Sequence, residues 1–180
     1  MQYWQDEASF SPTVDIGYSW FRPGQRPERN VKIIREYTYV LAAADPETGD
    51  LFGLLMPWLN AELFQVFLDE FAKHLETFYD LTKDEVWLLV DRAGWHVSKE
   101  LVIPTGIKLI VMPSGAAEIN PIEQLWLYIR EHYTRNVVWN NSEHLEETLI
   151  QAFRDLWAEP TRLQSVCAAG VLSEDLLVNL

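Results

Sequence analysis

The first third of the chain has the hydrophobic pattern of a series of β-strands. Runs rich in β-branched and aromatic residues predict strands at residues 3–8, 17–21, 31–43 and 51–56. Residues 45–50 separate the last two runs and combine Asp, Pro and Gly, which favour tight turns. We therefore expect the strands of this region to pair antiparallel.

Helical periodicity begins after Asn60, a residue that can cap a helix. The apolar face of this helix consists of Leu63, Phe64, Phe67, Phe71, Leu75 and Phe78. Two later runs, at residues 86–90 and 107–112, are short and nearly all apolar, which is typical of strands buried on both faces. A short helix or loop around residues 98–102 is expected between them.

Two more helices are predicted in the last third of the chain. One begins at Asn120, with Pro121 in its first position, where the missing N–H of proline does no harm. The other begins at Ser142, and its apolar face consists of Leu145, Leu149, Ala152, Phe153 and Leu156. The order of elements predicts an α/β domain with helices flanking a mixed sheet, its antiparallel strands first and its parallel strands later.

The composition favours a single domain over residues 1–180. Hydrophobic residues make up 48% of the chain, enough for a sizeable core. Cys167 is the one cysteine, so no internal disulfide can form, and a reducing cytoplasm is the expected compartment. We expect neither export nor membrane insertion, because we find no leader and no run of about 18 apolar residues.

The net charge of −13 is unusual for a protein that binds nucleic acid, because phosphate contacts normally need a basic surface. The charge is unevenly distributed, however, because cations cluster between residues 22 and 35. These cations are the candidate DNA-binding residues: Arg22, Arg26, Arg29, Lys32 and Arg35. If the protein acts on DNA, this basic segment makes the local contacts, or another polypeptide supplies most of the affinity.

Two carboxylates lie where predicted elements begin or end. Asp91 follows the buried run at residues 86–90, and ligands of open α/β sheets bind where strands end. The alternative is that Asp91 only starts a turn and binds no ligand. Glu123 lies on the first turn of the helix that begins at Asn120, where it could complete a capping box. Glu123 also lies about 100° around the helix from the centre of the buried face, so its side chain could instead point along the edge of the sheet.

The first predicted strand carries a third candidate. Asp6 and Glu7 are neighbours, so their side chains point to opposite faces. Asp6 shares its face with Trp4 and Ala8, which favours Asp6 as the inward acid. Three converging carboxylates can hold two divalent cations, the arrangement that phosphodiester chemistry uses.

Glu7, His96 and Asn120 are candidate supporting residues. His96 follows Asp91 in the same loop and could orient that carboxylate or contact phosphate. A histidine in a surface loop is nevertheless the ordinary interpretation of this spacing.

Several motifs stand in a characteristic order: residues 91–96 (DRAGWH), 101–104 (LVIP), 107–110 (IKLI), 118–126 (EINPIEQLW) and the segment that follows, 127–136. Together with Asp6-Glu7 they closely resemble the catalytic domain of bacterial insertion-sequence transposases related to mariner elements. Those are DDE-type enzymes with a ribonuclease H-like fold. The resemblance covers nearly the whole chain.

The resemblance implies that Asp6, Asp91 and Glu123 are the three metal-binding, catalytic acids. It also implies two Mg²⁺ ions, for which Mn²⁺ can substitute. The implied activity is metal-dependent cleavage and strand transfer of DNA, for movement of an insertion sequence.

Two departures from the family pattern keep other functions open. The loop at residues 113–117 keeps Pro113 but lacks the usual tyrosine and following proline. The family's amino-terminal helix-turn-helix region is expected to be absent, since Met1 lies so close to Asp6. The expected partners are then DNA, a helix-turn-helix polypeptide or the missing amino-terminal region, and a second copy of the chain. The alternatives are another ribonuclease H-like nuclease and a catalytically silent remnant that acts as an interaction module.

Overall fold

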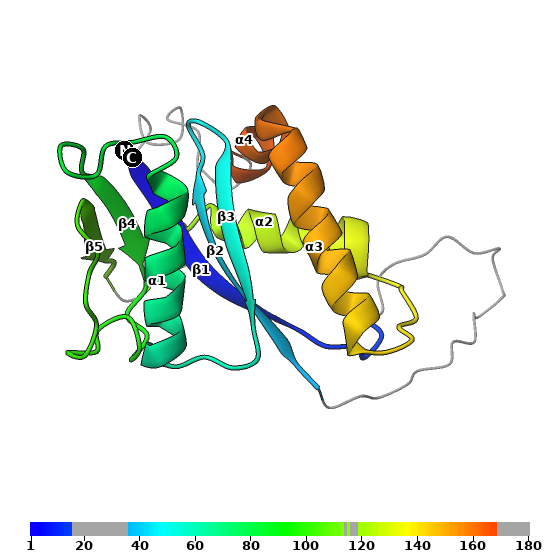
Figure 1. Cartoon of the computed structure of the whole chain (residues 1–180). Coiled ribbons are helices and arrows are strands. Elements are labelled where there is room, and N and C mark those ends of the chain that lie inside the picture. Colours follow the sequence, from blue (N-terminus) through cyan, green and yellow to red (C-terminus); the bar gives the residue numbers. More distant parts are fainter. Residues whose placement is uncertain (16–35, 114, 116–118, 169–180) are drawn as a thin grey trace, which may run out of the picture.

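The centre of the molecule is a five-stranded sheet of mixed direction, shown in Figure 1. The computed structural model describes residues 1–15, 36–113, 115 and 119–168. The strands are β1 (Gln2–Phe10), β2 (Thr38–Asp45), β3 (Asp50–Met56), β4 (Val86–Val90) and β5 (Ile107–Val111). They lie in the order β3-β2-β1-β4-β5. The first three strands pair antiparallel and β1, β4 and β5 run parallel, which confirms the predicted sheet.

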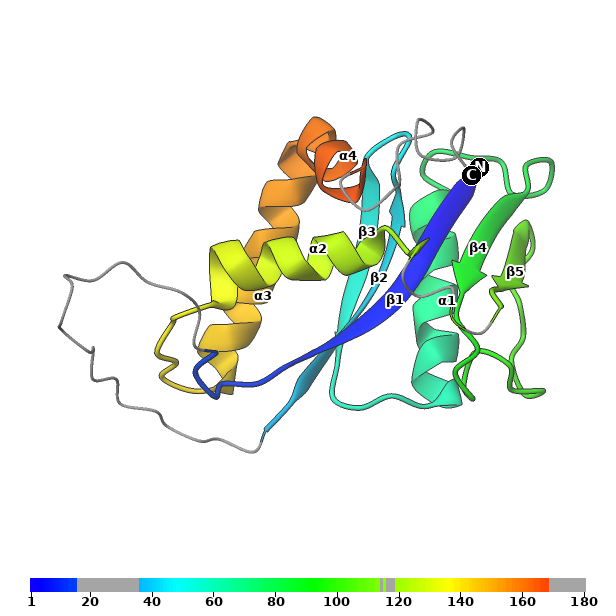
Figure 2. The same cartoon turned by 180° about the vertical axis from the view of Figure 1, so that it is seen from behind.

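Helices cover both faces of this sheet. The helical elements are α1 (Ala61–Leu75), α2 (Ile122–Ile129), the π-helical turn η2 (Arg130–Thr134), α3 (Ser142–Ala158) and α4 (Pro160–Ala168). The front view shows α1 on one face, and the view from behind in Figure 2 shows α2 lying across the other. Among the described residues, none of the helices has both the length and the apolar character needed to cross a membrane.

The sheet separates two apolar cores. One lies between the sheet and α1, where Tyr3 and Leu88 are fully buried. The other lies between the sheet and α2–α4, where Leu149 and Phe153 are buried. Gly53 on β3 permits the second contact, because a Cβ at that position would lie 2.3 Å from the Phe153 ring.

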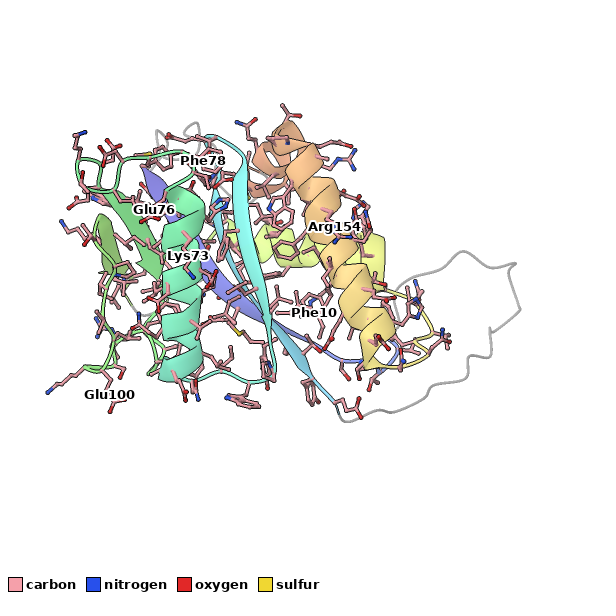
Figure 3. The ribbon with its side chains drawn as sticks, in the orientation of Figure 1. Phe10, Lys73, Glu76, Phe78, Glu100 and Arg154 are labelled. Carbon is pink, nitrogen blue, oxygen red and sulfur yellow. The ribbon has the colours of Figure 1, made fainter. Side chains whose placement is uncertain are left out.

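Some predicted boundaries were wrong. The strand predicted at residues 31–43 begins at Thr38 in the described part of the chain. Residues 17–21 and 31–35 lie outside the described residues. Helix α1 ends at Leu75, so Phe78 does not share its buried face; its side chain is 63% exposed and stands beyond the end of α1 in Figure 3.

The start of α2 and the last helix differ from expectation, whereas residues 98–102 form a loop, one of the two forms expected there. Helix α2 begins at Ile122 rather than at Asn120, a difference of the size common at helix ends. The sequence does not predict α4, because its buried positions, Leu163 and Cys167, are too few to form a recognisable pattern.

Candidate active site

Asp6 on β1 and Asp91, which directly follows β4, are at corresponding positions of two adjacent parallel segments. The pairing of β1 with β4 runs in register from Gln2 and Trp87 to Trp4 and Leu89. Continuing this register by two residues leads to Asp6 on β1 and to Asp91, which directly follows β4. β4 ends at Val90, so Asp91 and the neighbouring Asp6 lie at the carboxyl end of β4, the part of the sheet where α/β proteins bind ligands.

Asp6 points toward α2. Side chains alternate along a strand, and Ala8, two residues from Asp6, is buried in the core beneath α2. Oδ2 of Asp6 accepts a hydrogen bond of 2.9 Å from Nε1 of Trp126 on α2. Asp6, and not Glu7, therefore faces the helix that carries Glu123.

The surroundings of Asp6 disfavour an isolated negative charge. Burial is the main cause that raises its pKa to about 7, and the charges of Glu7 and Glu123 act in the same direction. The hydrogen bond from Trp126 opposes this rise. A carboxylate in this state fits a divalent cation, because the positive charge would offset both the desolvation and the repulsion.

Glu123 has an exposed side chain on the first turn of α2. The capping box suggested by the sequence does not form, because Oδ1 of Asn120 accepts the N–H of Ile122 (3.1 Å) instead of that of Glu123. Nδ2 of Asn120, which is buried, donates to the carbonyl oxygen of Gln5 at 3.1 Å. Asn120 thus joins the start of α2 to β1 beside Asp6.

His96 is buried, so its interpretation as a surface histidine was wrong. Its Nδ1 lies 2.7 Å from Oδ1 of Asp91, and its Nε2 lies 2.9 Å from Oε1 of Glu7. The second contact has an ion-pair distance, but the ring N–H is not aligned with the oxygen as in a hydrogen bond. Burial lowers the pKa of His96, but Glu7 and Asp91 outweigh burial and the net pKa is raised. Asp91 also accepts the N–H of Ala93 at 2.8 Å, so its turn-forming role is present as well.

Sequence reasoning did not identify two tryptophans of this site. Trp126 binds Asp6, and Nε1 of Trp95 donates to Oε1 of Glu7 at 2.7 Å. Only their positions in the sequence could have indicated these tryptophans, because Trp95 precedes His96 and Trp126 lies one helical turn after Glu123.

The three candidate acids do not form a complete metal-binding site among the described residues. In the described part of the chain, no three side chains of His, Cys, Asp or Glu are grouped closely enough to hold a metal ion. Asp91, at 50% side-chain exposure, and the exposed Glu123 are accessible from solvent, whereas Asp6 is more enclosed. The basic residues predicted to contact DNA lie outside the described residues: Arg22, Arg26, Arg29, Lys32 and Arg35.

Two comparisons concern the sequence. Residues 2–146 match the model of a family described as DDE superfamily endonuclease. An uncharacterized protein of Sinorhizobium fredii (strain NBRC 101917 / NGR234), y4pE/y4sA, is 26% identical over 130 residues. The alignment covers 72% of this chain and 93% of that protein.

The fold is similar to that of several solved Mos1 structures. The Mos1 mariner paired-end complex with Mn gives a TM-score of 0.66 at 15% identity, over 95% of this chain and 56% of that chain. The Mos1 strand transfer complex gives 0.62 at 15% identity, over 96% and 55%. The paired-end complex with Mg gives 0.58 at 16% identity, over 95% and 56%. The chain therefore spans just over half of the length of these Mos1 chains, and the likeness shows a ribonuclease H-like fold.

Proposed function

The chain belongs to the DDE superfamily endonuclease family, and we propose that it is the catalytic domain of a transposase that cuts and joins DNA strands with divalent metal ions. The proposal rests on one observation: Asp6 on β1 and Asp91 directly after β4 are at corresponding positions of adjacent parallel segments, and Glu123 lies on the helix that Asp6 faces. The Mos1 complexes described as paired-end and strand transfer complexes support the choice of a transposase over another nuclease of this fold.

Asp6, Asp91 and Glu123 are the proposed ligands of two Mg²⁺ ions, with Mn²⁺ as a substitute. When bound, the ions would activate the attacking water or 3′-hydroxyl and neutralise charge on the phosphate. The chain itself positions the ligands: Trp126 holds Asp6, and Asn120 attaches the helix of Glu123 to β1. Catalysis in this arrangement depends mainly on positioning and electrostatics.

The proposed partners are DNA, a helix-turn-helix polypeptide that recognises the element ends, and a second copy of the chain. Residues 22–35 carry five cations and are the proposed phosphate contacts of this domain. The cytoplasm is the proposed location, because the DNA substrate of an insertion sequence is there.

The test is metal-dependent nicking of DNA that carries the inverted repeats flanking the gene, in the presence of the amino-terminal partner. Asp91→Asn should abolish nicking and leave the fold intact, because a neutral amide is a poor ligand for a hard cation. Asp69→Asn, the same change at an exposed position of α1, is the matched control and should keep full activity.

Undiminished nicking by Asp91→Asn would remove Asp91 from the mechanism. A parent protein that folds but neither binds Mn²⁺ nor nicks DNA would favour the alternative of a catalytically silent interaction module.

A further inference from the structure

Glu7, His96 and Asp91 form a continuous polar chain from β1 to the end of β4. Nδ1 of His96 lies 2.7 Å from Oδ1 of Asp91, and Nε2 of His96 lies 2.9 Å from Oε1 of Glu7. Trp95 donates to the same oxygen of Glu7 at 2.7 Å. The side chains of His96 and Glu7 are 0% and 9% exposed, whereas that of Asp91 is 50% exposed. This row of three polar side chains therefore leads from the interior of the protein to the accessible carboxylate of Asp91.

Stability alone does not account for this arrangement. Removing a carboxylate and an imidazole from water costs free energy, and apolar residues of similar volume often fill such positions at least as well. Backbone hydrogen bonds already join β1 to β4. The ring of Phe64 lies 4.4 Å from that of His96, between centroids, and restricts the orientation of the imidazole. The polar chain is thus costly and well ordered, as is common for groups that support a functional site.

We infer that Glu7 and His96 are positioning residues that hold the carboxylate of Asp91 for metal binding, an inference that rests on the proposed function. Oδ1 of Asp91 is engaged by Nδ1 of His96 and by the N–H of Ala93, so the side chain is held in one orientation. Oδ2 makes neither of these two contacts and is the oxygen that would bind a cation. Glu7 sets the orientation of His96 in turn.

Glu7 is poorly suited to bind the metal itself. Its Oε1 is engaged by both Trp95 and His96, and its side chain lies on the face of β1 opposite to that of Asp6. The adjacent acids of β1 therefore have different tasks: Asp6 is a proposed ligand, and Glu7 acts through His96.

The test measures Mn²⁺ binding to the whole chain by electron paramagnetic resonance, in which binding reduces the signal of free aqueous Mn²⁺. Two substitutions distinguish the ring nitrogens of His96. In His96→Asn the side-chain amide takes the place of Nδ1 and can keep the contact with Asp91. In His96→Gln the amide reaches the place of Nε2 and can keep only the contact with Glu7.

We expect His96→Gln to weaken Mn²⁺ binding about 10- to 100-fold, the range typical for loss of a group that orients a metal ligand. His96→Asn should bind Mn²⁺ more tightly than His96→Gln. A role in packing alone would give the opposite order, because glutamine fills more of the buried volume. Glu7→Gln, which keeps the size of the side chain, should also weaken binding.

His74→Gln is the matched control. Nε2 of His74 lies 2.7 Å from Oδ2 of Asp50, the same kind of pair, but at the start of β3 and away from Asp91. This variant should bind Mn²⁺ as the parent does. Thermal denaturation of each variant establishes that the protein measured is folded.

The outcomes separate this inference from the proposed function. Unchanged Mn²⁺ affinity in His96→Gln, with weakened binding in Asp91→Asn, would overturn the inference and leave the proposed function standing. Unchanged affinity in Asp91→Asn would remove Asp91 from the metal site, and the positioning role with it. An equal loss in His74→Gln would show a general effect on the fold and would also overturn the inference.

Discussion

Asp6→Asn should stabilise the folded protein at neutral and alkaline pH when divalent ions are absent. Burial, with the nearby charges of Glu7 and Glu123, raises the pKa of Asp6 from the ordinary value of 3.8 to about 7. Between these two values the folded state keeps a proton that the unfolded state has released. The stability associated with this proton is therefore complete below pH 3.8 and is lost as the pH rises through about 7.

The size of the effect follows from the same two values. At pH 5, about two units below the folded pKa, the preference of the folded state for the proton is worth about 2–3 kcal/mol, at about 1.4 kcal/mol per unit. Almost none of it remains at pH 8. Asparagine does not ionise, and its side-chain oxygen can still accept the hydrogen bond from Trp126. Between pH 5 and pH 8 the parent should lose about 2–3 kcal/mol more stability than Asp6→Asn does.

Urea unfolding followed by tryptophan fluorescence, from pH 5 to pH 8 in EDTA, measures this difference. Asp50→Asn is the control of opposite sign. Burial raises the pKa of Asp50, but hydrogen bonds from His74 and Tyr3 outweigh burial and lower the net pKa. Removing this carboxylate should therefore destabilise the protein at neutral pH, and the loss should shrink as the pH falls through the folded pKa.

Mg²⁺ added at pH 8 should restore stability to the parent but not to Asp6→Asn, because binding to the folded state alone stabilises it. Parallel curves of stability against pH for the parent and Asp6→Asn would refute the argument, because Asp6 would then titrate equally in the folded and unfolded states.

Two further predictions concern DNA binding and packing. The chain alone should bind duplex DNA weakly and without sequence preference in gel shifts. If about four of the cations at residues 22–35 reach phosphates, the logarithm of affinity should fall with log salt at a slope of roughly −4; tight, sequence-specific binding would contradict this. Gly53→Ala should cost about 1–3 kcal/mol in urea unfolding, because its Cβ would lie 2.3 Å from the Phe153 ring. Gly94→Ala, where the Cβ would meet nothing within 4 Å, should change stability little, and equal stabilities for the two variants would contradict the packing argument.

The sequence by itself determined most of the local structure. The apolar face predicted after Ser142 is the buried face of α3, and the short apolar runs at residues 86–90 and 107–112 contain β4 and β5. The alternation of side chains along a strand also predicted that Asp6 and Glu7 lie on opposite faces of β1, as their contacts with Trp126 and Trp95 show. These inferences succeed because helical and strand periodicity are set by covalent geometry over a few residues. The predicted end of the first helix, which included Phe78, failed because periodicity alone does not mark where a helix stops.

Only the tertiary structure decided which side chains meet. The burial of His96 between Glu7 and Asp91 requires β4 to lie beside β1, although 75 residues separate those two strands. The contact of Trp126 with Asp6 likewise requires α2 to cross the face of β1. Such contacts depend on strand order and register, which arise when distant segments bury apolar surface together. No local pattern of residues records that order, and for this reason the contacts of Trp126 with Asp6 and of Trp95 with Glu7 could not be predicted from the spacing of these residues.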